Sequence, residues 1–449
     1  MSSEWQVVRI EDIAAKRPSA MATGPFGSSI GAKYFQNAGV PVIRGSNLSP
    51  DIQTKLDDSG LVFVSDEKAR EFDRCLVGKG DLVFTCWGTI NQVGLIDRDA
   101  AYEGYIISNK QMKLTVDEQR VDPRFIYYVF SGPEKQAEII DNGIGSSVPG
   151  FNLGQLRKHE VLLPSLREQR AIADTLDLFT DRITLLRKTN ATLEDIAQAL
   201  FKSWFVDFDP VRAKVEGRQP EDMDAATAAL FPNSLEESEL GLVPKGWSTS
   251  KLGNVCDYLN RGISPKYVEA GGVLVINQKC IRDFSIDFTK ARRHDPFQRK
   301  IDGRGLAVGD VLVNSTGVGT LGRVAQVLAL SEQAIVDSHV TVVRAGTGLT
   351  WSFLGQWMMH QQPQIEAMGE GSTGQTELSR SKLAELRLTV PPASILSIFD
   401  GLVWPLKERI ALNESRVQVI TQLRGTLLPR LISGQLRLPE AESMLDAVS

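Results

Sequence analysis

The chain has 449 residues, enough for two or three domains. Its hydrophobic content of 42% and charged content of 23% are ordinary for a soluble globular protein. No window reaches the ~18 uncharged apolar residues of a membrane span. The first residues, MSSEWQVVRIEDI, lack the basic start and apolar core of a signal peptide. We therefore expect a cytoplasmic protein with no membrane partner.

The spacing of the cysteines and histidines does not fit a metal site. Cys75, Cys86, Cys256 and Cys280 show no C-x-x-C spacing, and the four histidines are scattered. This pattern argues against a structural zinc site, a disulfide framework and a metal enzyme. We expect no metal and a reducing compartment.

The formal net charge of −5 is unevenly distributed. Residues 207–240 carry nine acidic and three basic side chains, whereas residues 251–344 carry thirteen basic and nine acidic ones. Salt screens charges over about 10 Å, so local charge governs binding more than the total does. The acidic stretch predicts a connector between domains, and the basic region leaves nucleic acid open as a partner.

In chain order, each half of the sequence reads as a mixed domain followed by a long helix. Short apolar runs between glycine-rich turns predict strands, and longer apolar periodicities predict helices. We expect strands at 40–43, 82–85, 273–276 and 311–313, and helices at 123–130 and 351–360.

A heptad seam follows each mixed domain, because apolar residues alternate at spacings of four and three. The first seam holds Ile172, Leu176, Phe179, Ile183, Leu186, Leu193 and Leu200. Adding 227 to this run of positions leads to the second, with Phe399, Val403, Leu406, Ile410, Val417, Ile420 and Leu427. About 40 residues of helix span roughly 60 Å, too long to fit inside one small domain.

One interpretation of the seams is an ordinary dimerisation coiled coil. Because both lie in one chain, each behind a domain, we favour an antiparallel intramolecular pair. Asn190 and Asn413 are then either register-setting polar residues or tolerated end positions. Pro405 either kinks the second helix or marks its true start.

The ends of the helices carry their own signals. Ser165 and Glu168 are spaced as a capping box behind Pro164. Ser433-Gly434 predicts the end of the second helix.

The two halves are copies of one unit. The offset is 227 residues from Leu163-Pro164 to Val390-Pro391, a period too long for a solenoid. Three further pairs match: WQVVRIEDI with WSTSKLGNV, KGDLVF (79–84) with VGDVLV (308–313), and GIGS (143–146) with GEGS (369–372).

The predicted fold class is α+β, with two tandem mixed α/β domains, each followed by a long helix, and the helices paired as an antiparallel coiled coil. The predicted boundaries are 1–164 for the first domain, 165–206 for its helix, 207–245 for the acidic connector, 246–392 for the second domain, and 393–449 for the second helix and C-terminal tail.

No catalytic constellation is found in the sequence. It lacks the G-x-x-x-x-G-K-[ST] phosphate loop, the G-x-S-x-G elbow and the Asn-Pro-Pro-aromatic signature of amino-methyltransferases. Gly317-x-Gly319 favours a hairpin turn over a dinucleotide loop, and Asp66-Glu67-Lys68 favours a solvated helix start over a nuclease cluster. We therefore expect no catalytic residues.

Polar loops recur at matching places in both halves. Backbone amides, hydroxyls and cations can hold a phosphate, and Asn or Gln amides can pair with adenine in the major groove. Each residue alone is more simply a turn residue, a cap or a solvated cation, but their recurrence favours DNA binding. The candidates are Phe26, Gly27, Ser28, Ser29, Lys33, Tyr34, Arg44, Asn47, Trp87, Thr89, Asn91, Gln92, Arg261, Lys266, Tyr267, Asn277, Gln278, Lys279, Arg282, Arg292, Arg293, Ser315 and Thr316.

Four segments, spread along nearly the whole chain, resemble the DNA-specificity subunit of type I restriction–modification systems. They are GPFGSSIGAKYFQNAGVPVIRGSNL (24–48), LLPSLREQRAIADTLD (162–177), ALFKSWFVDFDPVRAKVEG (199–217) and LLPRLISGQL (427–436). The resemblance implies a non-catalytic chain in which two target-recognition domains each read half of a split double-stranded DNA site. It also implies that the paired helices set the spacer and dock two modification subunits, which methylate adenine with S-adenosylmethionine, and that restriction or motor subunits can join.

The sequence departs from that pattern in its second half. In place of GPFGSS stands Arg261-Gly262-Ile263-Ser264-Pro265-Lys266, which implies that the two domains read different sequences and that the site is asymmetric. The second helix also lacks the Glu168-Gln169 pair and the capping box of the first, and has Ser394-Ile395-Leu396-Ser397 there, so its partner contacts need not equal those of the first.

Two other interpretations stay open at this point. A free-standing DNA-binding regulator would use the same loops without a partner. A coiled-coil interaction protein with ligand-binding domains would fit the acidic pI of about 5.6.

Overall fold

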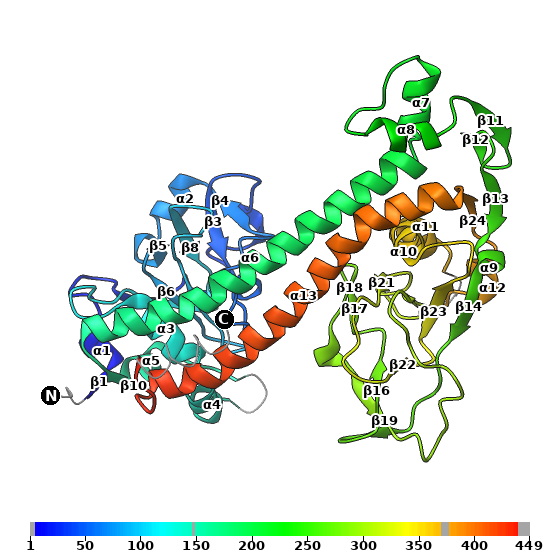
Figure 1. The fold of residues 1–449 in the computed structure, drawn as a ribbon. Coiled ribbons are helices and arrows are strands. Elements are labelled where there is room, and N and C mark those ends of the chain that lie inside the picture. The colour runs from blue at the N-terminus through cyan, green and yellow to red at the C-terminus, as the bar shows by residue number, and fades with distance from the viewer. Residues whose placement is uncertain (1–4, 146–148, 370–376, 439–449) are drawn as a thin grey trace. The chain divides into compact units, whose positions relative to one another are not determined.

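A computed structural model describes residues 5–145, 149–369 and 377–438 (Figure 1). The chain divides into two compact units, Met1–Leu185 with Val417–Ser449, and Leu186–Arg416. Parts of the predicted GIGS and GEGS loops and of the C-terminal tail lie outside the described residues. Across the described ranges, no helix is long and apolar enough to cross a membrane.

The first unit carries two four-stranded sheets. One has the order β2 (Met21–Thr23), β9 (Gln111–Leu114), β6 (Leu82–Thr85), β7 (Val93–Leu95). The other has the order β4 (Val62–Val64), β3 (Val40–Ile43), β8 (Gly104–Ile107), β5 (Leu76–Gly78). Of the pairs in these two sheets, β3 and β8 run parallel, and the others are antiparallel.

Helices and one further strand pair complete the first unit. Strands β1 (Gln6–Arg9) and β10 (Glu160–Leu163) pair antiparallel and lead into α6 (Leu166–Phe205). The shorter helices are α1 (Ile10–Ile13), α2 (Asp66–Arg70), α3 (Pro123–Ser131), α4 (Pro133–Asp141) and α5 (Leu153–Lys158).

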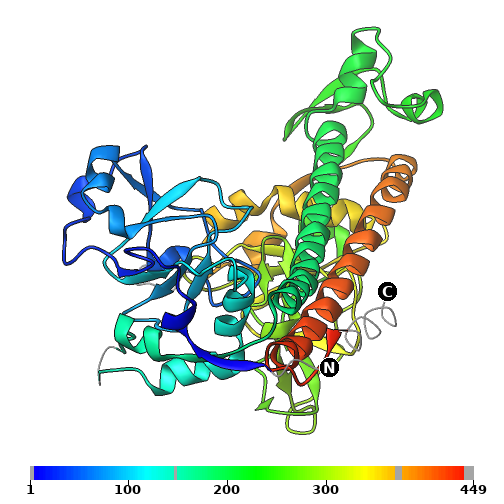
Figure 2. The ribbon, with the colours of Figure 1, turned by 90° about the vertical axis from the view of Figure 1, so that its left-hand side faces the viewer.

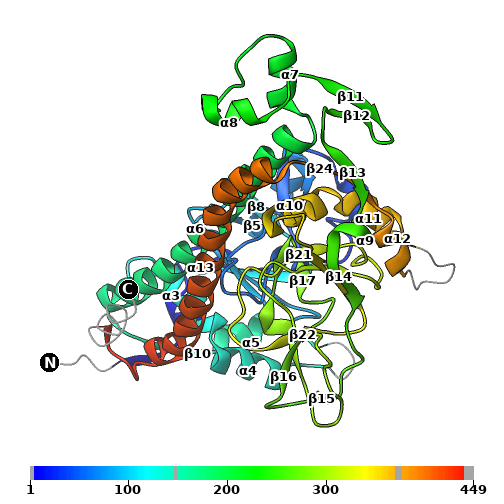
Figure 3. The same ribbon diagram turned by 45° about the vertical axis from the view of Figure 1, so that its right-hand side comes forward.

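The second unit repeats the plan (Figure 3). Its sheets have the orders β14 (Cys256–Arg261), β23 (Val340–Ala345), β20 (Val311–Asn314), β21 (Val324–Gln326), and β15 (Tyr267–Val268), β19 (Arg292–His294), β16 (Val273–Ile276), β22 (Ala334–Val336). Strands β16 and β22 form its parallel pair, and β13 (Ser248–Lys251) pairs with β24 (Arg387–Val390) before α13 (Ala393–Ile432).

The remaining elements of the second unit are short. The helices are α9 (Leu252–Val255), α10 (Trp351–His360), α11 (Gln362–Ala367) and α12 (Arg380–Ala384), and β17 (Ile281–Arg282) pairs with β18 (Ser285–Ile286). The predicted acidic connector is itself folded, with α7 (Asp209–Val215), α8 (Ala225–Leu230) and the hairpin β11 (Leu235–Ser238) and β12 (Gly241–Pro244).

The central strand of each unit is buried on both faces. In β6, Leu82 and Phe84 join the core that includes α3, while Val83 joins the core of the other sheet. In β20, Val311 and Val313 join the core with α10, while Leu312 faces the other way. Side chains alternate along a strand, so burial on both faces produces the uninterrupted apolar runs that predicted these strands.

The KGD and VGD motifs form the same turn in both units. Gly80 and Gly309 have φ of 88° and 95°, a region that favours glycine. The following carboxylates accept from the backbone: Asp81 from the N–H of Gly78 at 2.9 Å, and Asp310 from that of Ala307 at 2.8 Å. The sequence repeat therefore reflects a repeated backbone requirement.

Within each unit, segments of α6 and α13 lie side by side (Figure 2). The core of the first unit joins Ile172–Phe179 of α6 with Leu427–Leu431 of α13. The core of the second joins Ala197–Phe205 of α6 with Ile395–Val403 of α13. The start of one helix thus packs with the end of the other in both units, which confirms the predicted fold class with its antiparallel helix pair.

Most seam positions are buried. These are Ile172, Leu176, Phe179, Ile183, Leu186, Phe399, Val403, Ile410 and Leu427, while Leu193, Leu200, Leu406, Val417 and Ile420 are half-buried. Asn413 is fully buried and donates to Asn190 Oδ1 at 2.8 Å. A hydrogen-bonded asparagine pair in an apolar seam fits the register-setting alternative.

Helix α13 corrects one expectation. It runs continuously from Ala393 through Pro405 to Ile432, so the alternative that Pro405 marks its start is wrong. Proline removes one backbone donor, but packing along the seam holds the helix on both sides of it. The Ser165 half of the predicted capping box is present, since the N–H of Glu168 donates to Ser165 Oγ at 3.3 Å, while the Glu168 carboxylate accepts from Arg437 at 2.9 Å. Gly434 has φ of 74° just past the last turn of α13, as predicted for the helix end.

Candidate nucleic-acid interface

The first domain has a polar pocket where its parallel strands end. Loops leaving the carboxyl ends of β3 and β8 meet at one edge, the position where open α/β sheets commonly bind ligands. Together with the loop after β6 they line a pocket of about 450 Å³. Of the predicted residues, Arg44, Trp87, Thr89 and Gln92 line it.

Other predicted residues of the first domain lie exposed. The side chain of Phe26 is 81% exposed and that of Trp87 is 51% exposed, and Gly27, Ser28, Lys33 and Thr89 are also on the surface. Tyr34 lies under two ammonium groups, with Lys33 at 4.8 Å and Lys68 at 4.2 Å from its ring centre. These groups can meet a ligand without rearrangement of the core.

Four predicted polar side chains of the first domain are engaged within the chain. Asn47 is fully buried and donates to the carbonyls of Asp57 and Ser59 at 2.9 and 3.1 Å. Gln92 donates to the carbonyl of Leu48 at 2.7 Å, and Arg44 to that of Gly60 at 2.7 Å. Ser29 Oγ donates to the carbonyl of Phe26 at 2.7 Å. The residue Asn91 is half-buried. Asn47 and Gln92 therefore brace the loops, and a role in base contact stays a prediction for them.

The same edge of the second domain carries different side chains. Asn277 and Gln278 follow β16, and Asp337 to His339 follow β22. Asn277 is 8% exposed and donates to the carbonyl of Lys290 at 3.0 Å, so it braces its loop as Asn47 does. Burial raises the pKa of the Asp337 carboxyl.

The loop after β20 occupies the place of the Trp87 loop. Ser315 is fully buried, and its hydroxyl shares a 2.5 Å hydrogen bond with that of Thr341. Thr316 is half-exposed, with its Oγ1 2.8 Å from Nδ1 of His339.

The remaining candidates of the second domain do not gather in one place. Arg292 on β19 stacks at 3.4 Å over the ring of Tyr267 on β15, and its neighbour Arg293 makes two 2.7 Å contacts with Glu332. Arg261 pairs instead with Glu377 and donates to the carbonyl of Leu378 at 2.7 Å. Lys266, Lys279 and Arg282 are exposed, the last 3.5 Å from Asp283.

Comparison with known proteins shows which family the chain resembles. Residues 2–195 match the family model for the type I restriction modification DNA specificity domain. The chain is 23% identical over 452 residues to the type I restriction enzyme MjaIX specificity subunit of Methanocaldococcus jannaschii, covering 97% of this chain and 94% of that one. It is 24% identical over 414 residues to the HindI specificity subunit of Haemophilus influenzae, covering 80% and 87%.

Over most of its length the chain is similar to type I specificity subunits. A crystal structure of the type I restriction-modification system S subunit from M. genitalium has the same fold, with a TM-score of 0.57 at 15% identity, covering 95% of this chain and 96% of that one. The family supports the DNA-specificity interpretation over the two alternatives that the sequence left open.

Sequence reasoning missed a whole polar loop of the first pocket. Ser108, Asn109 and Lys110 follow β8 and line the pocket beside Arg44 and Thr89. Asn109 also donates to the carbonyl of Gly27 at 2.8 Å, which ties the GPFGSS loop to this edge. The available signal was the apolar run Gly104–Ile107 followed by Ser-Asn-Lys, the same strand-then-polar pattern that identified Arg44.

Within the described ranges, no three His, Cys, Asp or Glu side chains gather as metal ligands would. Burial raises the pKa of the thiols of Cys86 and Cys256 to about 12, so neither is poised as a nucleophile.

Proposed function

We propose that this chain is the non-catalytic subunit that gives a type I restriction–modification complex its DNA sequence specificity. Each mixed domain reads one half of a split double-stranded DNA site. The observation that carries the proposal is the repeated unit with unlike side chains at the equivalent edge. Arg44 and Lys110 border it in the first domain, and Gln278 and His339 stand there in the second.

Different donors and acceptors at that edge read different bases. Arg and Lys pair best with the N7 and O6 acceptors of guanine, whereas an amide such as that of Gln pairs with adenine. Two unlike half-sites make the whole site asymmetric. Because the internal braces Asn47 and Asn277 fix the loops, the exposed residues around them carry the readout.

The helices supply the surfaces for partners. In the first unit, Leu178 and Leu185 of α6 are 66% and 54% exposed. In the second, Leu402 and Leu412 of α13 are 47% and 46% exposed. Leu185 and Leu412 lie 227 residues apart, at equivalent positions of the two helices. Leucines on a solvent-facing helix surface suit protein contacts, so we assign one modification subunit to each helix.

The modification subunits hold the chemistry. They bind S-adenosylmethionine and methylate adenine, while this chain binds no cofactor, and restriction or motor subunits join the same assembly to act in host defence. The purified chain alone is therefore expected to leave DNA unmethylated.

A genome-wide map of methyladenine tests the function. Cells with the gene intact should show a split asymmetric motif that disappears when the gene is deleted. Methylation of DNA by the purified chain alone, or a map unchanged by deletion in cells that contain a modification partner, would contradict the proposal.

A second experiment tests the reading edge. Lys110→Gln should weaken or alter only the first half of the methylated motif, because Lys110 lines the pocket of the first domain. Lys158→Gln, an exposed lysine at the end of α5, removes the same charge outside the pocket and should leave the motif unchanged. A change in the second half-site alone would contradict the assignment.

A further inference from the structure

A lysine is buried in the central sheet of the first domain. Lys113 lies on β9 between Ala22 of β2 and Val83 of β6, and its side chain is almost entirely buried, with the residue 5% exposed. Lysine is rarely buried to this degree unless it is paired.

The second domain shows what the fold itself requires at this position. The KGD and VGD motifs align Val83 with Leu312, and the ladder partner of Leu312 on β23 is Val342. Val342 is 3% exposed in the equivalent place. An apolar residue therefore satisfies the same ladder position, and the cation in the first domain needs a reason other than folding.

The ammonium of Lys113 has spare hydrogen-bonding capacity. Within the described residues, it donates to the carbonyl of Leu76 at 2.6 Å. An ammonium has three donors, and removing a charged group from water is costly unless its donors are satisfied. Burial lowers the pKa of Lys113, with the nearby carboxylate of Asp81 opposing that effect. Two donors of Lys113 thus remain for a ligand.

Lys113 lines a pocket of about 540 Å³ together with three further cations, Arg17, Arg74 and Lys79. Two carboxylates share the lining, Asp73 and Asp81. Asp81 is already engaged by the N–H of Gly78 at 2.9 Å and by the hydroxyl of Thr115, and Arg17 lies 3.9 Å from it. Four cations against two carboxylates leave the lining with a net positive charge.

We propose that this pocket binds a phosphate group. A tetrahedral oxyanion offers several acceptors to converging cations, and Lys and Arg are the residues that bind phosphate. The phosphate can be a phosphodiester of the DNA backbone or part of a soluble phosphate compound. Only the DNA source rests on the proposed function, since the charge and burial of the pocket do not depend on it.

Titration of the full-length chain with inorganic phosphate at constant ionic strength tests the pocket. Lys79→Met, which removes an exposed cation of the lining, should weaken binding at least about threefold, and Lys113→Val, which copies Val342, about tenfold or more. Lys16→Met, an exposed cation outside the lining, should bind like the original chain. If Lys113→Val fails to fold, Lys79→Met still tests the pocket, because Lys79 is exposed.

The salt dependence of binding to duplex DNA separates the two sources. Log K falls as log salt concentration rises, and each lost phosphate contact makes this slope less steep by about 0.9. A less steep slope in Lys79→Met, but not in Lys16→Met, identifies the DNA backbone as the source. Phosphate binding that is lost in Lys79→Met while the DNA slope stays the same identifies a soluble phosphate compound.

Two results would overturn the proposal. One is the absence of both phosphate binding and any slope change. The other is an equal loss of phosphate binding in Lys16→Met and Lys79→Met, which would show only general attraction to a basic surface. A failed methyladenine map would leave the inorganic phosphate titration unaffected, so the two proposals fail separately.

Discussion

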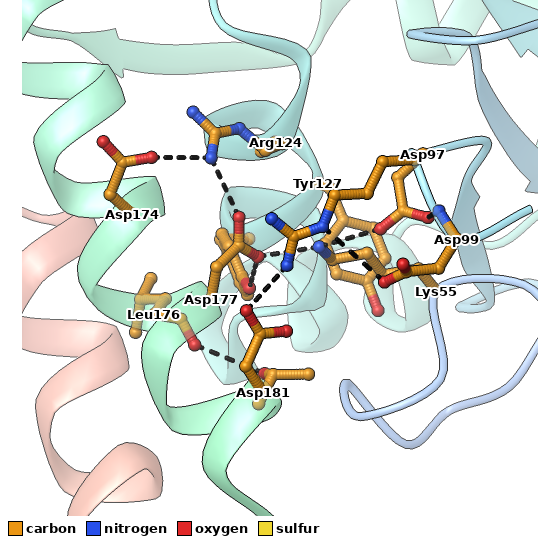
Figure 4. Close-up of polar contacts among 12 residues, drawn as sticks. Lys55, Asp97, Asp99, Arg124, Tyr127, Asp174, Leu176, Asp177 and Asp181 are labelled. Carbon is orange, nitrogen blue, oxygen red and sulfur yellow. Dashed lines mark hydrogen bonds and ion pairs between the residues drawn. The ribbon is translucent and has the colours of Figure 1, made fainter. Parts of the chain in front are cut away.

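The two domains fasten to their helices with different chemistry at equivalent positions. In the first, Asp177 of α6 bonds Lys55 at 2.7 Å, Arg124 at 2.9 Å and the hydroxyl of Tyr128 at 2.6 Å (Figure 4). The position 227 residues later is Trp404, whose ring packs edge-on against Trp351, with 4.3 Å between ring centres. An ionic network in one copy is thus replaced by an aromatic pair in the other.

The network of the first unit extends further along α6. Lys55 also contacts Asp97 at 3.0 Å, Arg124 contacts Asp174 at 2.7 Å, and Arg98 contacts Asp181 at 2.6 Å. Because the apolar seam already positions the helices, the polar contacts are free to diverge between copies. The apolar seam therefore sets how the two helices pack. The contacts that fasten each domain to its helix, here called anchors, set how each unit responds to pH and salt.

The second unit has one strong polar anchor of its own. Lys407 of α13 is 1% exposed and pairs with Glu194 of α6 at 2.5 Å, and Glu194 also accepts from Gln356 at 2.9 Å. In the first unit the buried cation from α13 is Arg424, which donates to Gln53 at 2.7 Å. Both units therefore place a cation of α13 in the seam, but at different helix positions.

The largest expected effect comes from breaking the buried pair of the second unit. Glu194→Ala leaves Lys407 charged and buried, which should cost about 4 kcal/mol of unfolding free energy. Hydrogen exchange measured on the whole chain should show the loss in α10 and in the second-unit part of α13. The double variant Glu194→Leu with Lys407→Met should recover most of the stability; if it is as unstable as Glu194→Ala, the charge argument is wrong.

The matching change in the first unit should be somewhat smaller. Asp177→Ala removes the common partner of Lys55 and Arg124, which are less completely buried, and should cost about 3 kcal/mol. Exchange should rise in α3 and in the loop that holds Lys55. The conservative variant Asp177→Asn keeps the shape of the side chain but not its charge. Its unfolding free energy should lie between that of the original chain and that of Asp177→Ala.

Acid should weaken the first unit before the second. Burial acts to raise the pKa of Asp177, but Lys55, Tyr128 and Arg124 outweigh it and hold that pKa below its ordinary value of 3.8. A lowered pKa in the folded state gives stability that is present above about pH 4 and is lost as the pH falls through the folded pKa. Asp177→Asn should remove this acid sensitivity.

Glu414 of the second unit contributes to stability with the opposite pH dependence. Burial raises the pKa of Glu414, so its contribution is largest in acid and declines as the pH rises towards that value. Hydrogen exchange at pH 3.5 and pH 6 would compare the units in one sample. Earlier loss of the second unit in acid would refute the assignment.

The aromatic anchor should respond to neither pH nor salt. Trp404→Ala removes a half-buried ring and should cost about 2 kcal/mol, less than a fully buried tryptophan. The loss should be the same in 0.05 and 0.5 M salt, whereas the Asp177→Ala loss should shrink as salt screens the network. Equal salt dependence in both variants would remove the distinction drawn between the anchors.

The smallest effect concerns the glycine turn that the two copies share. Gly80→Ala should cost about 1 kcal/mol, because its φ of 88° strains other residues. Gly309→Ala should cost more, since an added Cβ would meet Cβ of Trp351 at 2.9 Å, whereas at Gly80 it would meet the flexible end of Glu118. Thermal denaturation of the two variants would rank them, and the reverse order would contradict the packing argument.

The sequence by itself determined the elements that rest on local periodicity. Two heptad seams at one offset predicted both 40-residue helices, and apolar runs between glycine turns predicted strands β3, β6, β16 and β20. These succeed because helix and strand periods, caps and positive-φ glycines are encoded within a few residues.

Only the tertiary structure decided which polar residues lie exposed at the pockets. Asn47 and Asn277, both predicted to contact bases, are buried, and their amides donate to carbonyls ten or more residues away. Lys110 came to the pocket through the parallel pairing of β3 and β8, and Lys113 was buried by strands on both sides. Contacts between distant segments fix these roles, and a pattern read along the chain carries no record of such contacts.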